Sequence, residues 1–101
     1  MQNNIISAAL IDKTAHLLTK KIMDLIIERK VEYAQLRELA IYVREELPNL
    51  KTQQDYKDFV DGLEFDFPYL DTEIKIFMEE EKRFQEQAVI NKLQSYIKTL
   101  N

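Results

Sequence analysis

The sequence predicts an all-α protein, a four-helix bundle-like domain whose N-terminal and C-terminal helices are long. Hydrophobic residues make up 46% of the chain and charged residues 32%, a balance typical of a folded globular domain. One glycine, Gly62, and two prolines, Pro48 and Pro68, are too few turn residues for a β-sheet. Apolar residues also recur at three- and four-residue steps, the period of helices. At 101 residues the chain is expected to form one helical domain, residues 1–101.

A first helix is predicted over residues 5–29, followed by a short turn. Its apolar stripe consists of Ala8, Ile11, Ala15, Leu18, Ile22, Leu25 and Ile26, with Leu10, Leu17, Met23 and Ile27 beside it. A stripe this wide indicates contact with two or more neighbouring helices. The turn is placed at residues 30–32 because no apolar residue continues the stripe in register there. One continuous helix through this region is the alternative.

Two shorter helices are predicted over residues 33–47 and 53–64. Pro48 ends the first of them, because proline disfavours helical geometry in the preceding residue and has no N–H to donate. Thr52 begins the second as its N-cap, with Asp55 three positions later as in a capping box. Each of these helices carries one apolar face, which indicates packing on the long helices.

The longest helix is predicted over residues 71–99, with Asp71 as the favoured N-cap and Thr72 as the alternative. At about 1.5 Å per residue it would span roughly 42 Å, more than the width of a globule of this size. Its inner stripe is expected to contain Leu70, Ile74, Phe77, Met78, Phe84, Ala88, Val89, Leu93, Tyr96, Ile97 and Leu100. Spacings of eleven residues, as in Met78, Val89 and Leu100, favour globular packing along a nearly straight helix over a left-handed coiled coil.

Two arrangements of the helices fit these lengths. In the first, the helices 5–29 and 71–99 form a long pair that the two shorter helices cover in succession. In the second, the core forms around the first half of the last helix, and residues 87–100 pair with another subunit. A run of charged residues at 79–83 divides the last helix into the two halves.

Charge is distributed unevenly along this acidic chain, whose net charge is −4. Residues 1–30 hold five basic and three acidic residues, a net charge of +2. Residues 55–81 hold ten acidic residues and two lysines, a net charge of −8. Because general nucleic-acid binding needs a basic surface, nucleic acid is not the expected partner.

The sequence predicts a cytoplasmic protein without a membrane partner. No window approaches 18 uncharged apolar residues, the length that a membrane-spanning helix needs. The first residues contain no basic segment, and Asp12 interrupts their apolar run, so no signal peptide is expected. The lack of cysteine excludes disulfides and thiolate metal sites.

No residue pattern predicts catalysis, a cofactor or a metal, and we expect that the protein is not an enzyme. His16 is the only histidine, and no metal ligand follows it at three or four residues. The chain has no glycine-rich phosphate loop. Asp55, Asp58 and Asp61 stand three apart, as on one side of a helix, and not at the alternate positions of a calcium loop.

Two groups of apolar residues are candidates for binding a partner protein. Phe65, Phe67 and Tyr69 alternate along the turn before the last helix, and alternate residues cannot all be buried on one helical face. At least part of this group is therefore a candidate docking site. The second group, on the last helix, consists of Val89, Leu93 and Tyr96.

A candidate basic strip is formed by Lys30, Arg37 and Arg44, which follow one another at seven-residue intervals. Such a strip can bind the phosphate groups or the acidic residues of a partner. Pairing with the acidic helices of the same chain is the favoured interpretation, since exposed ion pairs are common and individually weak.

These observations favour a small protein–protein interaction or assembly module that binds another protein or a second copy of itself as a homodimer. An alternative is an acidic inhibitor or antidote that masks a basic partner surface with residues 55–81. A further alternative is weak nucleic-acid binding through the basic strip on the first two helices. No cofactor is expected in any of the three.

Overall fold

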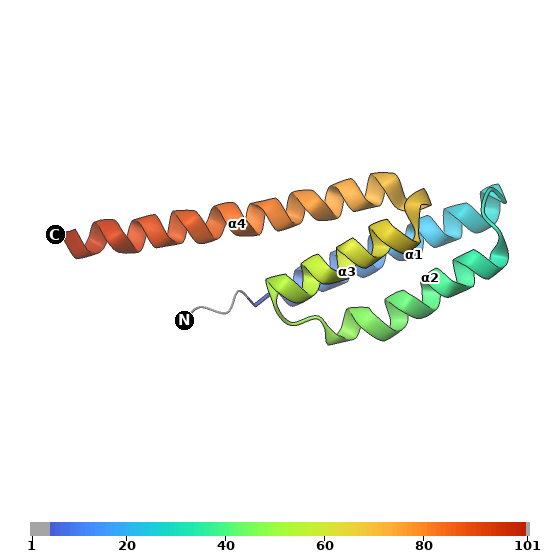
Figure 1. The fold of residues 1–101 in the computed structure, drawn as a ribbon, viewed down its shortest axis with the longest axis horizontal. Helices are drawn as coiled ribbons and strands as arrows, with labels where there is room; N and C mark the ends of the chain where they lie inside the picture. The colour runs from blue at the N-terminus through green and yellow to red at the C-terminus, as the bar shows by residue number, and fades with distance from the viewer. Residues whose placement is uncertain (1–4, 101) are drawn as a thin grey trace.

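Four α-helices and two short 3-10 turns make up the structure, a computed structural model that describes residues 5–100, with side chains as far as Lys98. The elements are α1 Ala8–Glu28, α2 Tyr33–Glu46, η1 Leu47–Asn49, α3 Gln53–Asp66, η2 Pro68–Leu70 and α4 Asp71–Leu100. Successive helices run in opposite directions (Figure 1). The predicted all-α, four-helix, bundle-like fold with long first and last helices is confirmed.

The first helix begins three residues later than predicted. The hydroxyl of Ser7 accepts a hydrogen bond from the Leu10 N–H at 3.1 Å, so Ser7 is the N-cap and the helix begins at Ala8. Ile5 forms an isolated β-bridge with Thr52 instead. The Ile6 N–H donates to the Lys51 carbonyl at 3.0 Å, and the Ile6 side chain is buried. The residues before α1 therefore lie along the start of α3.

The predicted turn between the first two helices is confirmed, and one continuous helix is excluded. Arg29 adopts the left-handed conformation, with φ 56°, and its N–H donates to the Leu25 carbonyl at 3.0 Å. This C-cap ends α1 without the glycine that usually occupies such a position. The chain then turns back into α2 at Tyr33.

A complete capping box begins α3, as predicted. The Thr52 hydroxyl accepts from the Asp55 N–H at 3.1 Å, and the Asp55 carboxylate accepts from the Thr52 N–H at 3.2 Å. The same carboxylate accepts from the Lys51 N–H at 3.0 Å. The two backbone hydrogen bonds, first that of Lys51, hold the pKa of Asp55 below its ordinary value.

The predicted N-cap of the last helix, Asp71, is instead its first helical residue, with φ −44° and ψ −52°. The 3-10 turn η2 leads directly into α4, so the chain has no extended residue at which a side-chain cap could form. Asp71 and Glu73 still lie in the first turn of α4, where negative charge complements the helix dipole.

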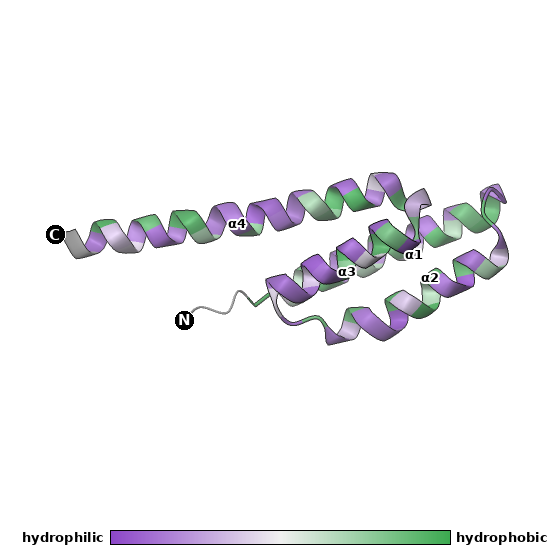
Figure 2. Cartoon of the chain, viewed as in Figure 1, coloured by the Kyte–Doolittle hydropathy of each residue, from purple (hydrophilic) through white to green (hydrophobic). Residues whose placement is uncertain are grey.

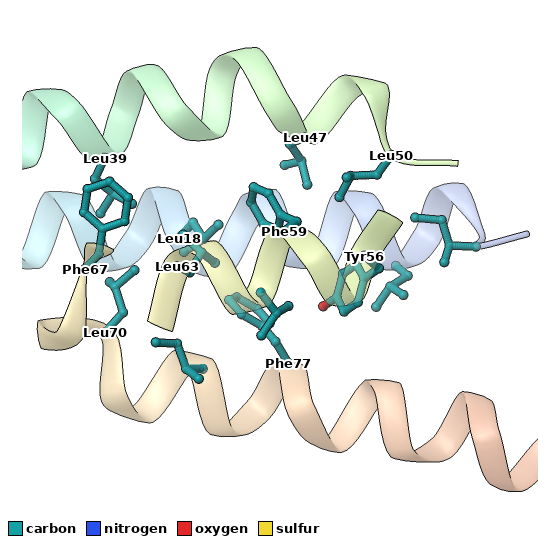
Figure 3. Close-up of a cluster of buried hydrophobic side chains, with 14 residues drawn as sticks. Leu18, Leu39, Leu47, Leu50, Tyr56, Phe59, Leu63, Phe67, Leu70 and Phe77 are labelled. Carbon is teal, nitrogen blue, oxygen red and sulfur yellow. The ribbon is translucent and has the colours of Figure 1, made fainter. Parts of the chain in front are cut away.

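The hydrophobic core forms around one face of α3. Its inward side chains, Tyr56, Phe59, Val60 and Leu63, are at most 3% exposed. Figure 3 shows Tyr56, Phe59 and Leu63 with Leu18 of α1, Leu39 of α2, Leu70 of η2 and Phe77 of α4. Phe77 meets Tyr56 edge to face, with ring centroids 6.5 Å apart. Every helix therefore contributes to a single core.

A buried polar contact connects α1 to α3. The Thr14 hydroxyl donates to the Leu10 carbonyl at 2.8 Å, so the Tyr56 hydroxyl, 3.1 Å away, must donate to Thr14 Oγ1. Burial raises the pKa of Tyr56 to about 12. Tyr56 therefore stays neutral, and both buried hydroxyls are satisfied.

Gly62 lets the ring of Tyr42 lie against α3. Tyr42 stacks on Phe59 with ring centroids 5.2 Å apart and an interplanar angle of 9°, and its hydroxyl donates to the Phe59 carbonyl at 3.0 Å. A Cβ at Gly62 would overlap the Tyr42 hydroxyl oxygen. The glycine lies inside α3, which continues to Asp66, so the predicted helix end at residue 64 is two residues short.

The molecule is elongated because α4 is longer than the core. The described residues extend 61 × 22 × 22 Å, and their radius of gyration is 16.5 Å against about 13 Å for a compact chain of this length. The second half of α4 projects beyond the other helices (Figure 1). α4 packs mainly on α3, and α1 packs mainly on α2, so the expected long pair of the first and last helices is wrong.

Phe77→Ala is expected to destabilise the fold by about 3–5 kcal/mol, because the buried ring leaves a cavity between α3 and α4. Urea unfolding followed by circular dichroism measures the change. Met78→Ala, at a position that is 37% exposed, is the matched control and should cost much less. Similar midpoints for the two variants would contradict this packing of α4.

Gly62→Ala is expected to destabilise the fold by about 1–2 kcal/mol, although this change inside a helix ordinarily stabilises. The new methyl group would displace the Tyr42 hydroxyl from the Phe59 carbonyl. Thermal unfolding measures the effect. Adding Tyr42→Phe to Gly62→Ala removes the overlapping oxygen and should recover part of the loss. A higher melting temperature for Gly62→Ala alone would show that Tyr42 does not need this space.

Candidate functional site

The candidate site is an apolar face on the projecting half of α4, which we name the C-terminal apolar face. It consists of Val89, Ile90, Leu93, Tyr96 and Ile97, which are between 46% and 71% exposed. Their spacing of one, three, three and one residues places them on one side of the helix. From Val89 to Lys98 every side chain is exposed, so no other part of the described chain covers this face.

The C-terminal apolar face points away from the bundle. Phe84 packs against the core, and Leu93 follows it by nine residues, about two and a half helical turns. The two side chains therefore lie on opposite sides of α4. The expectation of one inner stripe along the whole helix is wrong, and the core forms around the first half of α4 only. The side chain of Leu100 lies outside the described residues.

A charged segment separates the two halves of α4. Residues 79–83 are all charged, and Figure 2 shows them as a hydrophilic stretch between hydrophobic ones. The Glu80 carboxylate pairs with Lys13 of α1 and, at 3.3 Å, with Arg83. Lys21 of α1 lies 3.9 Å from Glu73 Oε1, too far for a hydrogen bond to that buried oxygen. The pair between Lys13 and Glu80 joins α4 to α1 one turn before Phe84, whereas Glu73 lies beside α1 in the first turn of α4.

The C-terminal apolar face is nearly free of charge. Lys92 is the only ionisable side chain besides Tyr96 between residues 87 and 97. On the opposite side of the helix, the Gln87 amide donates to the Asn91 side-chain oxygen at 3.0 Å. The surface is therefore apolar on one side and polar on the other, with Lys92 as the only charged side chain between residues 87 and 97.

The structure brings the predicted residues Val89, Leu93 and Tyr96 together on this face. Ile90 was missed among the candidate residues, and Ile97 was assigned to an inner stripe. Both stand three or four residues from Leu93, and that spacing is the sequence signal that identifies them. Whether the face binds a partner stays a prediction.

The other predicted docking group is divided. Phe67 is 6% exposed and packs against Tyr42 and Tyr69, so it belongs to the core and not to a surface. Tyr69 is half-buried, and its hydroxyl donates to the Gln35 carbonyl at 3.3 Å. Phe65 is 86% exposed near the end of α3. One exposed ring does not form a docking surface of its own.

The candidate basic strip is exposed and narrow. Lys30 lies in the turn after α1, and Arg37 and Arg44 lie on α2. Arg44 pairs only with its neighbour Glu45, at 3.9 Å, and within residues 5–98 no ion pair joins the strip to α3 or α4. The favoured interpretation, pairing with those acidic helices, is therefore wrong, and the three charges remain at the surface.

Part of the acidic segment 55–81 is engaged within the chain. Asp55 caps α3, Asp61 pairs with Lys57 at 3.1 Å, and Glu73 and Glu80 face lysines of α1. Burial and the charge of Asp61 raise the pKa of Glu81, and Lys57 opposes them. These intramolecular contacts reduce the charge available to a basic partner.

A second exposed apolar group lies at the opposite end of the molecule. It consists of Met23, Ile26 and Ile27 of α1 and Tyr33 at the start of α2. α1 and α2 extend beyond α3 and α4 at this end, as Figure 1 shows. The first three residues belong to the wide stripe of the first helix, which was expected to meet two neighbours and here extends past the core.

A surface pocket of about 260 Å³ lies between α2 and α3 and is lined by Tyr42, Glu46, Asn49, Leu50, Asp55, Asp58 and Phe59. Asp55 is already engaged as a cap, and within residues 5–98 no group of three or more histidine and acidic side chains is arranged to hold a metal. Over the same stretch, no helix has the length and apolarity needed to cross a bilayer.

Comparisons of the chain with models of protein families, with curated proteins and with solved structures find no match. Any proposal about function therefore depends on the geometry and chemistry of the chain itself.

Glu81→Gln is expected to increase the free energy of unfolding at pH 7 slightly, and so to raise the melting temperature. The increase should be less than about 0.5 kcal/mol, since the side chain is partly exposed. The folded pKa lies above the unfolded value, so ionised Glu81 opposes folding at neutral pH. Lowering the pH through the folded pKa removes this cost, and the difference between variant and parent should shrink.

Thermal unfolding between pH 7 and pH 4 measures this difference. Glu79→Gln, at an exposed position on nearly the opposite side of α4, controls for the loss of one negative charge. If Glu81→Gln raised the melting temperature by the same amount at pH 7 and pH 4, ionisation of Glu81 would not be the cause.

Proposed function

We propose that the protein is a helical interaction module that binds another protein chain through the C-terminal apolar face of α4. The observation that carries this proposal is the exposure of five apolar side chains on one side of a helix that projects beyond its own core. Removing apolar surface from water stabilises a complex by roughly 25 cal/mol per Å². Contiguous apolar patches on a protein surface are typical of binding sites.

The way the face is held also supports the proposal. The projecting half of α4 is continuous with a half that is packed on α3, so its helix grows from turns that are already formed. A partner would therefore meet a helix whose first turns are already ordered, which reduces the conformational entropy lost on binding. The narrow apolar stripe resembles the helices that dock into grooves or onto other helices.

A photo-reactive amino acid at position 93 tests the proposal in native cell extract. Irradiation is expected to attach this position covalently to another protein chain, because Leu93 lies at the centre of the face. The matched control is the same amino acid at position 91. This position is also exposed and lies only two residues from Leu93, but on nearly the opposite side of α4. Gel electrophoresis and mass spectrometry identify the products.

Cross-linking at position 93 and not at position 91 supports the C-terminal apolar face as the binding surface. No product at position 93, or the same products in equal yield at both positions, would remove the basis of the proposed function. Circular dichroism confirms beforehand that both variants fold.

A further inference from the structure

The C-terminal apolar face has the same order of apolar positions in both directions along α4. Counted from Leu93, apolar residues lie four and three positions before it, at Val89 and Ile90, and three and four positions after it, at Tyr96 and Ile97. A two-fold axis between two antiparallel helices places the residues before Leu93 beside the residues after the partner's Leu93, with residues on the same flank of the face in contact. The face is therefore complementary in pattern to itself, as a two-fold contact requires.

We propose that this face binds the same face of a second copy of the chain, with the two α4 helices antiparallel and the two-fold axis near Leu93. The inference depends on the proposed function and specifies its partner. Leu93 meets the partner's Leu93 at the axis. On either side, Ile90 meets the partner's Ile97, and Val89 meets the partner's Tyr96.

The charges next to the face favour the antiparallel pair over a parallel one. Lys82 and Glu86 precede Leu93 by eleven and seven residues, three and two helical turns, and so lie on the same side of α4. In a parallel pair each residue meets its own copy, which would place glutamate against glutamate and lysine against lysine. The antiparallel pair places these residues beyond the apolar overlap.

The neutrality of the face favours a second copy over a charged partner. Charged residues make up 32% of the chain, but Lys92 is the only lysine, arginine or acidic residue between positions 87 and 97. Two such segments meet without strong like-charge repulsion. A partner that is selected by its charge would find almost no complementary charge here.

The size of the face determines how the pair behaves. The face spans about 12 Å along the helix and offers a few hundred Å² of apolar surface, below the roughly 800 Å² per partner of a stable interface. Association is therefore reversible and depends on concentration. Two molecules of 61 Å that overlap along about 20 Å of α4 form a particle roughly 100 Å long.

Single cysteines test this arrangement cleanly, because the chain contains no cysteine of its own. The full-length variants Ile90→Cys and Ile97→Cys are oxidised separately and as an equal mixture. In the antiparallel pair the two different cysteines meet, so the mixture should form a disulfide dimer of twice the 12.1 kDa chain mass. Each variant alone should form little dimer, since identical positions lie roughly 10 Å apart along the axis, beyond disulfide reach.

The outcomes separate the arrangements. Dimer in the mixture alone supports the antiparallel pair. Dimer from each variant alone and no more in the mixture indicates a parallel pair and overturns the proposal. A ladder of higher oligomers indicates head-to-tail binding, for example to the exposed group around Met23 and Ile27, and also overturns it.

Sedimentation of the unmodified chain over a concentration series provides the second measurement. Leu93→Glu should weaken dimerisation roughly tenfold or more, as expected for a central interface residue, whereas Phe65→Glu, at an exposed ring on α3, should leave it unchanged. A chain that stays monomeric at all concentrations overturns the self-association proposal. If position 93 still cross-links a different protein in extract, the proposed function stands without it.

Discussion

The burial of one face of α3 determines how far the core extends, and the rest of the molecule depends on that limit. α3 has 14 residues and spans about 21 Å, whereas α4 has 30 residues and spans about 45 Å. Side chains of α4 are buried only in the part of the helix that lies beside α3. This part ends near Phe84. The remaining turns of α4 extend past the core, and α1 and α2 extend past it at the other end (Figure 1). Exposed apolar residues at both ends follow from this difference in helix length.

Local chemistry explains why most of the fold could be predicted from the sequence. Pro48 ends the second helix and the Thr52–Asp55 capping box begins the third, because these signals act within a few residues. The predicted start of the first helix, Ile5, was wrong because the hydroxyl of Ser7 supplies the N-cap. Ile6 is buried although it is not helical. Apolar periodicity extended the helix to Ile5, but the backbone hydrogen bonds of that segment go to the start of α3.

The candidate site depended on information that the sequence does not contain. Phe77 and Ala88 repeat at eleven residues on the bundle side of α4, and Met78 and Val89 repeat at the same interval on nearly the outer side. The eleven-residue spacing occurs on both sides of α4, so it could not show which side faces the bundle or where α3 ends beside it. The sequence also could not show which of Phe65, Phe67 and Tyr69 is buried, because Tyr42, the partner of Phe67, lies 25 residues away in the sequence. The sequence identified Val89, Leu93 and Tyr96 as candidate residues, but the direction in which they point depends on the position of α3.

The attachment of α4 to the bundle connects the fold to the proposed binding role. Glu80 pairs with Lys13 and Arg83 one turn before Phe84, the last large side chain of α4 that packs on the core. Beyond it, every side chain from Val89 to Lys98 is exposed, and the helix there is maintained mainly by propagation from the packed turns. Such a segment opens most easily at its far end, so a partner that covers the C-terminal apolar face adds the packing that the helix lacks. The proposed binding would therefore also order the last turns of α4, whereas the packing of the first half of α4 on α3 sets the direction in which the face is presented.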